Sequence, residues 1–156
     1  DLVVVTGSQN NVKRAYTSGT PALAVGAGNV AVIVDETADL ADAADKIQAS
    51  KTFDNATSCS SENAVVIVDA IYDDFVAEMA RTGAALITDD TQITSTLWTK
   101  GHLNPKAIAQ EADKTIAALG LTDSVPSDTS YIAVETTGIG PSHPLSGEKL
   151  SRVLSV

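Results

Sequence analysis

The chain has 156 residues and 44% of them are apolar, which is enough for one domain with a core of its own. Its net charge is −10 and its pI is about 4.4. A phosphate-backbone binder needs a basic surface, so these values argue against nucleic acid as a partner and disfavour an anionic membrane surface. The longest apolar runs have about five residues, whereas a membrane-spanning helix needs ~20.

A single cysteine cannot form an internal disulfide, which suits a reducing compartment such as the cytoplasm. The chain starts with Asp1 directly before a strand-like run, and it stops in another strand-like run, LSRVLSV. We therefore expect it to be a segment of a longer protein.

The first elements in chain order are a continuous apolar strand over 2–6, then a turn with a short helix over 7–19. Such a strand is typically covered on both faces. A second buried strand is predicted over 30–35, followed by a helix over 39–51 with Asp39 as its N-cap. The apolar residues at helical spacing in that helix are Leu40, Ala43, Ala44 and Ile47.

The alternation continues with a strand over 64–69, a helix over 71–83 and a short strand over 84–88. Gly83 is the predicted stop of the helix. Its apolar face is expected to consist of Phe75, Met79 and Ala80.

The clearest helical pattern covers 104–120, with Asn104 as cap, Pro105 in the first turn and Gly120 at the end. Its apolar stripe consists of Ile108, Ala112 and Ile116. A further strand is predicted over 130–135. Strands that alternate with helices predict an α/β fold, with a mostly parallel sheet flanked by helices.

Cys59 lies just before the apolar run AVVIVD, in a polar segment. A lone cysteine is most often a small buried residue, but a structural one belongs inside the apolar run. A loop-to-strand junction exposes the side chain and leaves backbone N–H groups that stabilise a thiolate and later an oxyanion. The pattern therefore predicts a nucleophile. Its polar neighbours are Thr57, Ser58, Ser60 and Ser61.

The two histidines, His102 and His143, are both remote from Cys59 in the sequence. Either one is a candidate base for a cysteine hydrolase, and each also fits a surface or loop position. No metal-ligand spacing involves these residues, so we expect no metal site.

Two glycine motifs bear on cofactor binding. The stretch GAGNVA at 26–31 formally matches a dinucleotide fingerprint, but it leads into a strand where the fingerprint requires a helix. We interpret it as a glycine turn that permits close backbone approach. Gly7 and Ser8 follow a strand and precede a helix, so they are better placed to present N–H groups to an anion or a cofactor.

Three stretches closely resemble the aldehyde dehydrogenase superfamily, in particular its CoA-acylating branch. They read TGSQNNVKRAYTSGTPALAVGAGN, VIVDETADLADAADKIQASKTFDNATSCSSEN and GEKLSRVLS, and the resemblance covers nearly the whole chain. It implies an aldehyde dehydrogenase-like α/β catalytic domain. Residues 1–20 would then be the end of the cofactor-binding domain, and 21–156 the catalytic cysteine domain.

The resemblance also implies a reaction. Cys59 would attack an aldehyde, NAD or NADP would accept the hydride, and the acyl group would pass from a thioester on Cys59 to coenzyme A. Gly7, Ser8 and Glu148 match cofactor-binding positions, while Asn29 would shape the backbone of the site. The second oxyanion donor of the family lies upstream, so the segment alone is expected to be inactive. The family is usually dimeric or tetrameric, which implies a homo-oligomer.

Two departures from the family pattern stand out. Hydrolytic members carry a glutamate two residues before the glycine turn, where this chain has Ala24, so we expect transfer to CoA unless Glu62 or Glu135 replaces that base. Arg152 stands where relatives often carry proline, and the sequence offers no functional account of it.

The hydroxyls of Thr57, Ser58, Ser60 and Ser61 predict a polar pocket, for sulfoacetaldehyde first and acetaldehyde second. Two other readings stay open at this point. One is the cysteine hydrolase, and the other is a non-catalytic domain of the same fold.

Overall fold

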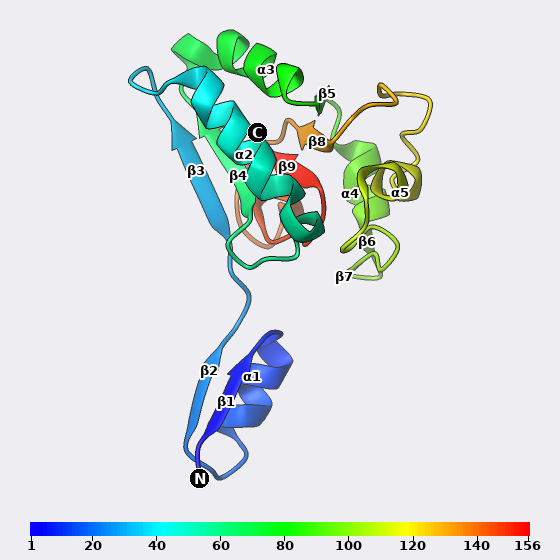
Figure 1. Cartoon of the computed structure of the whole chain (residues 1–156). Helices are drawn as coiled ribbons and strands as arrows, with labels where there is room; N and C mark the ends of the chain where they lie inside the picture. The colour runs from blue at the N-terminus through cyan, green and yellow to red at the C-terminus, as the bar shows by residue number, and fades with distance from the viewer.

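The computed structural model describes residues 1–156, and Figure 1 shows a small N-terminal unit set apart from a larger body. The unit consists of strand β1 (Val3–Thr6), helix α1 (Gln9–Tyr16) and strand β2 (Ala22–Val25), with the two strands parallel. Residues 26–29 lead from this unit to the body. The last strand of the unit ends at Val25.

Only one face of the β1–β2 pair is covered, so the prediction of a strand buried on both faces is wrong for this chain. Four apolar side chains of the pair and its flank are more than half exposed: Leu2, Val4, Leu23 and Val25. The opposite face packs on α1, which begins at its cap Ser8, whose Oγ accepts from the Asn11 N–H at 3.4 Å. Strand β2 was not predicted.

The body is built on a five-stranded sheet in the order β3-β4-β9-β8-β5, and every pairing in it is parallel. This arrangement confirms the predicted α/β fold. The strands are β3 (Val30–Val34), β4 (Glu62–Ile67), β5 (Ala84–Ile87), β8 (Tyr131–Val134) and β9 (Val153–Ser155).

Helices cover both faces of this sheet (Figure 1). Helices α2 (Leu40–Thr52) and α3 (Tyr72–Arg81) pack on one face, and α4 (Thr91–Leu97) and α5 (Ala112–Ala118) on the other. An antiparallel hairpin of β6 (Trp98–Thr99) and β7 (His102–Leu103) follows α4. None of the helices combines the length and the apolar composition that crossing a membrane requires.

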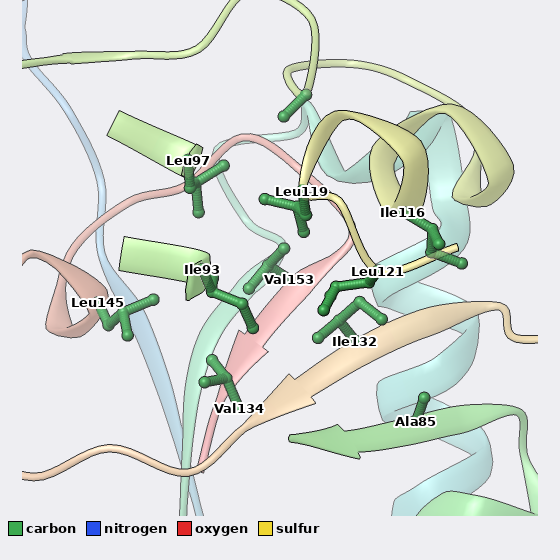
Figure 2. Close-up of a cluster of buried hydrophobic side chains, with 11 residues drawn as sticks. Ala85, Ile93, Leu97, Ile116, Leu119, Leu121, Ile132, Val134, Leu145 and Val153 are labelled. Carbon is green, nitrogen blue, oxygen red and sulfur yellow. The ribbon is translucent and has the colours of Figure 1, made fainter. Parts of the chain in front are cut away.

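Strand β8, which lies between β9 and β5, is buried along its whole length because its side chains alternate between two cores. Tyr131 and Ala133 belong to the core under α2 and α3. Ile132 and Val134 belong to the core under α4 and α5, where Figure 2 shows them beside Val153 of β9.

Three of the four predicted helices are confirmed, among them the short helix over 7–19, which is α1. Helix α2 starts at its predicted cap, since the Asp39 side chain accepts from the Asp42 N–H at 3.1 Å. Helix α3 ends before Gly83, which has a φ of 91°, although Ala80 on its predicted apolar face is exposed. The long helix over 104–120 is wrong, because only α5 is helical within it.

The first half of the predicted 104–120 helix is held in turns by tertiary contacts. Ala109 has a φ of 57° and donates its N–H to the Leu150 carbonyl at 3.0 Å, which an α-helix does not allow. Asn104 caps a short turn, since its Oδ1 accepts from the Lys106 N–H at 3.0 Å. Gly120 ends α5 as predicted, with a φ of 71°.

Candidate active site

Cys59 lies in an exposed turn directly before the amino end of β4. Its backbone N–H donates no hydrogen bond within the chain, although the neighbouring Ser61 N–H donates to the Ser58 carbonyl at 3.0 Å. An accessible thiol next to a free backbone donor can attack a carbonyl carbon and hold the oxygen that becomes negative. The predicted exposure of Cys59 at a loop-to-strand junction is confirmed.

The chain enters the Cys59 turn through three consecutive residues in left-handed conformation. Asp54, Asn55 and Ala56 have φ values of 47°, 53° and 59°. The Thr57 hydroxyl closes this turn by donating to the Asp54 carbonyl at 2.7 Å and contacts the Asp54 carboxylate at 2.8 Å. The hydroxyl of Thr57 is therefore engaged within its own turn.

The remaining predicted pocket residues divide into two kinds. The Ser58 and Ser60 Oγ atoms lie 2.8 Å apart on either side of Cys59, and Ser60 is exposed. Ser61 is only 4% exposed, and its Oγ has no hydrogen-bond partner. Ser58 and Ser60 are thus the two hydroxyls that the turn offers next to the thiol.

The glycine turn at 26–28 touches the Cys59 backbone. A Cβ atom placed on Gly28 would lie 3.1 Å from the Cys59 carbonyl oxygen and 4.0 Å from its Cβ. Next to it, the Asn29 side-chain amide donates to the Ser146 carbonyl at 2.8 Å. The structure confirms the predicted close backbone approach, and it links the turn to the loop that carries Glu148.

Glu148 lines a cavity of 570 Å³ beside Asn29. The residue is half-buried, and its backbone is fixed because the next residue, Lys149, donates its N–H to the buried Asn63 Oδ1 at 3.1 Å. The other residues around the cavity include Trp98, Ile139, His143, Ser146 and Gly147.

Gly7 and Ser8 belong to the N-terminal unit, where α1 begins. Gly7 has a φ of 134° and donates its N–H to the Val25 carbonyl at 3.1 Å, so that group is not available to a ligand. The Ser8 N–H makes no hydrogen bond within the chain. The first helical residue, Gln9, lies against Gly26, which places the start of α1 beside the glycine turn.

Neither histidine pairs with the thiol. His102 lies in the β6–β7 hairpin and is exposed, while the His143 ring packs against Gly138. No hydrogen bond joins either imidazole to Cys59. The geometry therefore gives the cysteine hydrolase no support. No three His, Cys, Asp or Glu side chains lie together in a way that could hold a metal ion.

Two fully buried lysines, which the sequence reasoning missed, underlie the site. Lys149 Nζ donates to the Leu145 and Gly147 carbonyls at 2.6 and 3.0 Å, and Lys51 Nζ donates to the Glu62 carbonyl at 2.8 Å. Burial lowers the pKa of Lys51 to about 8, against the opposing charge of Glu62. Burial, followed by the charge of Lys51, lowers the pKa of Lys149 to about 7.

A signal for Lys51 was present in the sequence. It follows Ala44 and Ile47 at helical spacing, so it occupies the buried stripe of α2. Lys149 lies in a loop without periodicity, and only its tertiary contacts reveal it.

The comparisons with known proteins agree with this architecture. The aldehyde dehydrogenase family matches residues 1–117 of the chain, which therefore belongs to that family. The chain is 48% identical to an acylating sulfoacetaldehyde dehydrogenase from Cupriavidus necator, with 100% of the chain and 32% of that protein aligned. The chain thus spans about a third of the length of this relative.

Solved structures of acylating enzymes have the same fold. An acetylating aldehyde dehydrogenase from Geobacillus thermoglucosidasius superposes with a TM-score of 0.92 at 36% identity, over 99% of this chain and 34% of that one. A propionaldehyde dehydrogenase from Rhodopseudomonas palustris, with bound CoA and an acylated cysteine, gives a TM-score of 0.80 at 27% identity. The superposition covers 99% of this chain and 35% of that one. The resemblance to the acylating branch that the sequence indicated is confirmed.

The buried lysines predict a stability that rises with pH. Between the lowered pKa of Lys149, about 7, and the ordinary lysine value of 10.5, the unfolded chain binds a proton that the folded chain lacks. The free energy of unfolding should therefore increase with pH across this window, by up to about 1.4 kcal/mol per pH unit for each such lysine. In urea unfolding experiments between about pH 7 and pH 10, Lys149→Met should reduce the increase of the free energy of unfolding with pH. The same substitution at the exposed Lys114 should leave this increase unchanged. An equal slope in Lys149→Met and wild type would contradict this prediction.

The contact at Gly28 predicts that a single methyl group will impair the site. In Gly28→Ala the new Cβ presses on the Cys59 carbonyl, and displacing a reacting group by a fraction of an ångström lowers the rate, here by about 10-fold or more. The measurement is kcat for aldehyde oxidation by the full-length protein. Ala27→Ser, at the exposed neighbouring position, is the control and should retain its rate. Wild-type kcat in Gly28→Ala would show that the contact does not matter.

Proposed function

We propose that the full-length protein carrying this chain is a CoA-acylating aldehyde dehydrogenase in which Cys59 is the nucleophile. The observation that carries the proposal is the exposed Cys59 thiol with its free backbone N–H, held against the Gly28 turn. The family membership and the acylating relatives support it.

In the proposed reaction the Cys59 sulfur attacks the aldehyde carbon, and the C=O electron pair moves to the oxygen. The Cys59 N–H donates to this oxyanion, which costs little reorganisation because the donor is already unpaired. When bound, NAD or NADP supplies the hydride acceptor, and oxidation leaves the acyl group as a thioester on Cys59. The CoA thiolate then attacks the thioester carbon and releases the Cys59 thiolate.

The residues of the chain fit a nicotinamide cofactor. The half-buried Glu148 carboxylate faces a cavity large enough for a ribose and can accept from its two hydroxyls. Ser8 would add its free N–H at the start of α1, and Gly7 would allow close approach through its left-handed backbone. We assign these three residues to cofactor binding.

Neither position 24 nor Glu135 offers a base that could activate water at Cys59. Ala24 replaces the glutamate of hydrolytic members, and Glu135 follows β8 at the carboxyl end of the sheet. Through the pairing of both strands with β9, Glu135 lies level with Val65 of β4, whereas Cys59 precedes Glu62 at the amino end of that strand, which puts at least about 10 Å between the two along the strand direction. Glu135 is also engaged by the Tyr72 hydroxyl, whose pKa is raised to about 12 by burial, with the Glu135 hydrogen bond adding to it.

Glu62, the other candidate base, does not occupy the place of the missing glutamate. Its backbone carbonyl accepts from Lys51, and its carboxylate, whose Oε2 is buried without a hydrogen-bond partner, acts electrostatically on that buried lysine. We therefore propose CoA as the acceptor of the acyl group.

The exposed apolar face of β1 and β2 supports the further proposal that the N-terminal unit is part of a cofactor domain. Val4 is 69% exposed and Val25 67%, although both lie in a parallel strand pair, and parallel sheets are normally covered on both faces. Additional parts of the full-length protein, or a second copy in a homo-oligomer, would bury them.

The nature of the acyl acceptor gives a prediction for product analysis. Without CoA, the full-length protein should release a single burst of reduced cofactor, because hydrolysis lacks a general base worth about 10²–10⁴ in rate. With CoA it should turn over steadily and form an acyl-CoA. Cys59→Ala is the control and should show neither burst nor turnover. Sustained release of free acid without CoA would contradict the proposal.

The hydroxyls of Ser58 and Ser60 favour a small polar aldehyde, and we propose sulfoacetaldehyde first and acetaldehyde second. The two hydroxyls bond to each other, and a polar aldehyde can use their remaining hydrogen-bonding capacity, which an alkyl chain cannot. We expect kcat/KM to be higher for sulfoacetaldehyde than for butyraldehyde. Ser60→Ala should reduce the ratio of kcat/KM for sulfoacetaldehyde to that for butyraldehyde. A higher kcat/KM for butyraldehyde in the wild-type protein would contradict a polar pocket.

A further inference from the structure

Three segments with strained backbones meet at one point behind the Cys59 turn. Asn55, Ala109 and Leu150 have φ values of 53°, 57° and 45°, in the left-handed region that non-glycine residues seldom adopt. The Ala109 N–H donates to the Leu150 carbonyl at 3.0 Å, and the Asn55 amide contacts the Ala109 carbonyl at 3.5 Å. Each such conformation is unfavourable by itself and persists only where its surroundings enforce it.

The Arg152 guanidinium is the group that joins these segments. Its Nε and Nη2 donate to the Asn55 Oδ1 at 3.0 and 2.7 Å, and Nη2 also donates to the Glu111 carboxylate at 2.9 Å. The Nη1 group reaches the Ser130 carbonyl at 3.3 Å. The Asn55 amide closes the ring by donating to the other Glu111 oxygen at 3.3 Å.

The environment makes this network stronger than an ordinary surface ion pair. The Arg152 side chain is only 14% exposed and makes charge-assisted bonds in a fixed fork geometry. By contrast, Arg81 pairs with Asp45 and Glu78 on the outside of α2 and α3, with 48% of its side chain exposed. Exposed pairs of that kind contribute little to stability.

The positions of the joined residues connect the network to the site. Asn55 belongs to the left-handed turn that leads into Cys59, four residues later in the sequence. Leu150 and Arg152 follow Glu148, the proposed cofactor ligand, by two and four residues. One guanidinium thus fixes the approach to the nucleophile and the end of the cofactor-binding segment relative to each other.

We propose that Arg152 is a positioning residue, which holds the left-handed turn at 54–56 and thereby sets the orientation of Cys59. The inference rests on the proposed catalytic role of Cys59. It also gives a role to Arg152, which stands where relatives often carry proline. The Arg152 N–H donates no hydrogen bond within the chain, so a proline at this position loses no backbone bond, whereas only the arginine supplies the guanidinium.

The test compares Arg152→Met with Arg81→Met in the full-length protein. The first readout is hydrogen exchange of the 53–61 segment, where the Thr57 and Ser61 N–H groups bond within the turn. We expect exchange there to accelerate about 10-fold or more in Arg152→Met and to stay at the wild-type rate in Arg81→Met. Arg152→Lys should recover part of the protection, because one ammonium cannot reproduce the fork.

The second readout is the burst rate of aldehyde oxidation per Cys59 thiol titrated with iodoacetamide. It should fall about 10- to 100-fold in Arg152→Met, while the KM for the cofactor stays within about twofold of wild type. A role in stability alone would lower the melting temperature and leave this rate per intact site unchanged. Should Arg152→Met fail to fold, Arg152→Pro removes the same guanidinium without the loss of a backbone bond.

Wild-type exchange at 53–61, or a wild-type burst rate per thiol, in the variant that lacks the guanidinium would overturn the proposal. The exchange readout needs no aldehyde, cofactor or CoA. A wild-type protein that oxidises no aldehyde would therefore contradict the proposed function, and the exchange of the 53–61 turn would still decide the role of Arg152.

Discussion

The candidate site depends on one steric constraint, which is that the Cys59 carbonyl lies where Gly28 has only hydrogens. This contact brings the turn that ends the N-terminal unit against the turn that begins β4. Asn29 then ties the same stretch to the loop before Glu148 through the Ser146 carbonyl. The proposed nucleophile, the glycine turn and the proposed cofactor ligand Glu148 thus come together from three segments far apart in the sequence.

The parallel sheet separates the site from the other polar groups of the chain. Every strand of the five-stranded sheet runs in one direction, so Cys59 and Glu148 lie near the amino ends, while Tyr72 and Glu135 lie at the carboxyl ends. Beneath the site, two buried ammonium groups bond to loop carbonyls and hold the loops in place. The hydrogen-bond acceptors of both lysines are backbone carbonyls, and no salt bridge joins either lysine to a carboxylate.

The sequence predicted those elements whose signals lie within a few neighbouring residues. Periodicity and capping residues predicted α2, α3 and most strands of the sheet, and the polar setting of Cys59 predicted its exposure. The helix over 104–120 failed because Ala109 is held by the Leu150 carbonyl, a contact between distant segments that outweighs helical propensity. Helix α4 was missed because its sequence, TQITSTL, is rich in β-branched and hydroxyl residues. The Arg152 network likewise joins residues that no local pattern relates.

The central claim is that the acyl group resides on Cys59 and waits there for CoA. Peptide mass spectrometry of the full-length protein, after incubation with aldehyde and oxidised cofactor but without CoA, tests it most directly. The account predicts one acyl increment on the peptide that contains Cys59 and its loss when CoA is added. An acyl group on another residue, or an unmodified Cys59 after a burst of reduced cofactor, would contradict it.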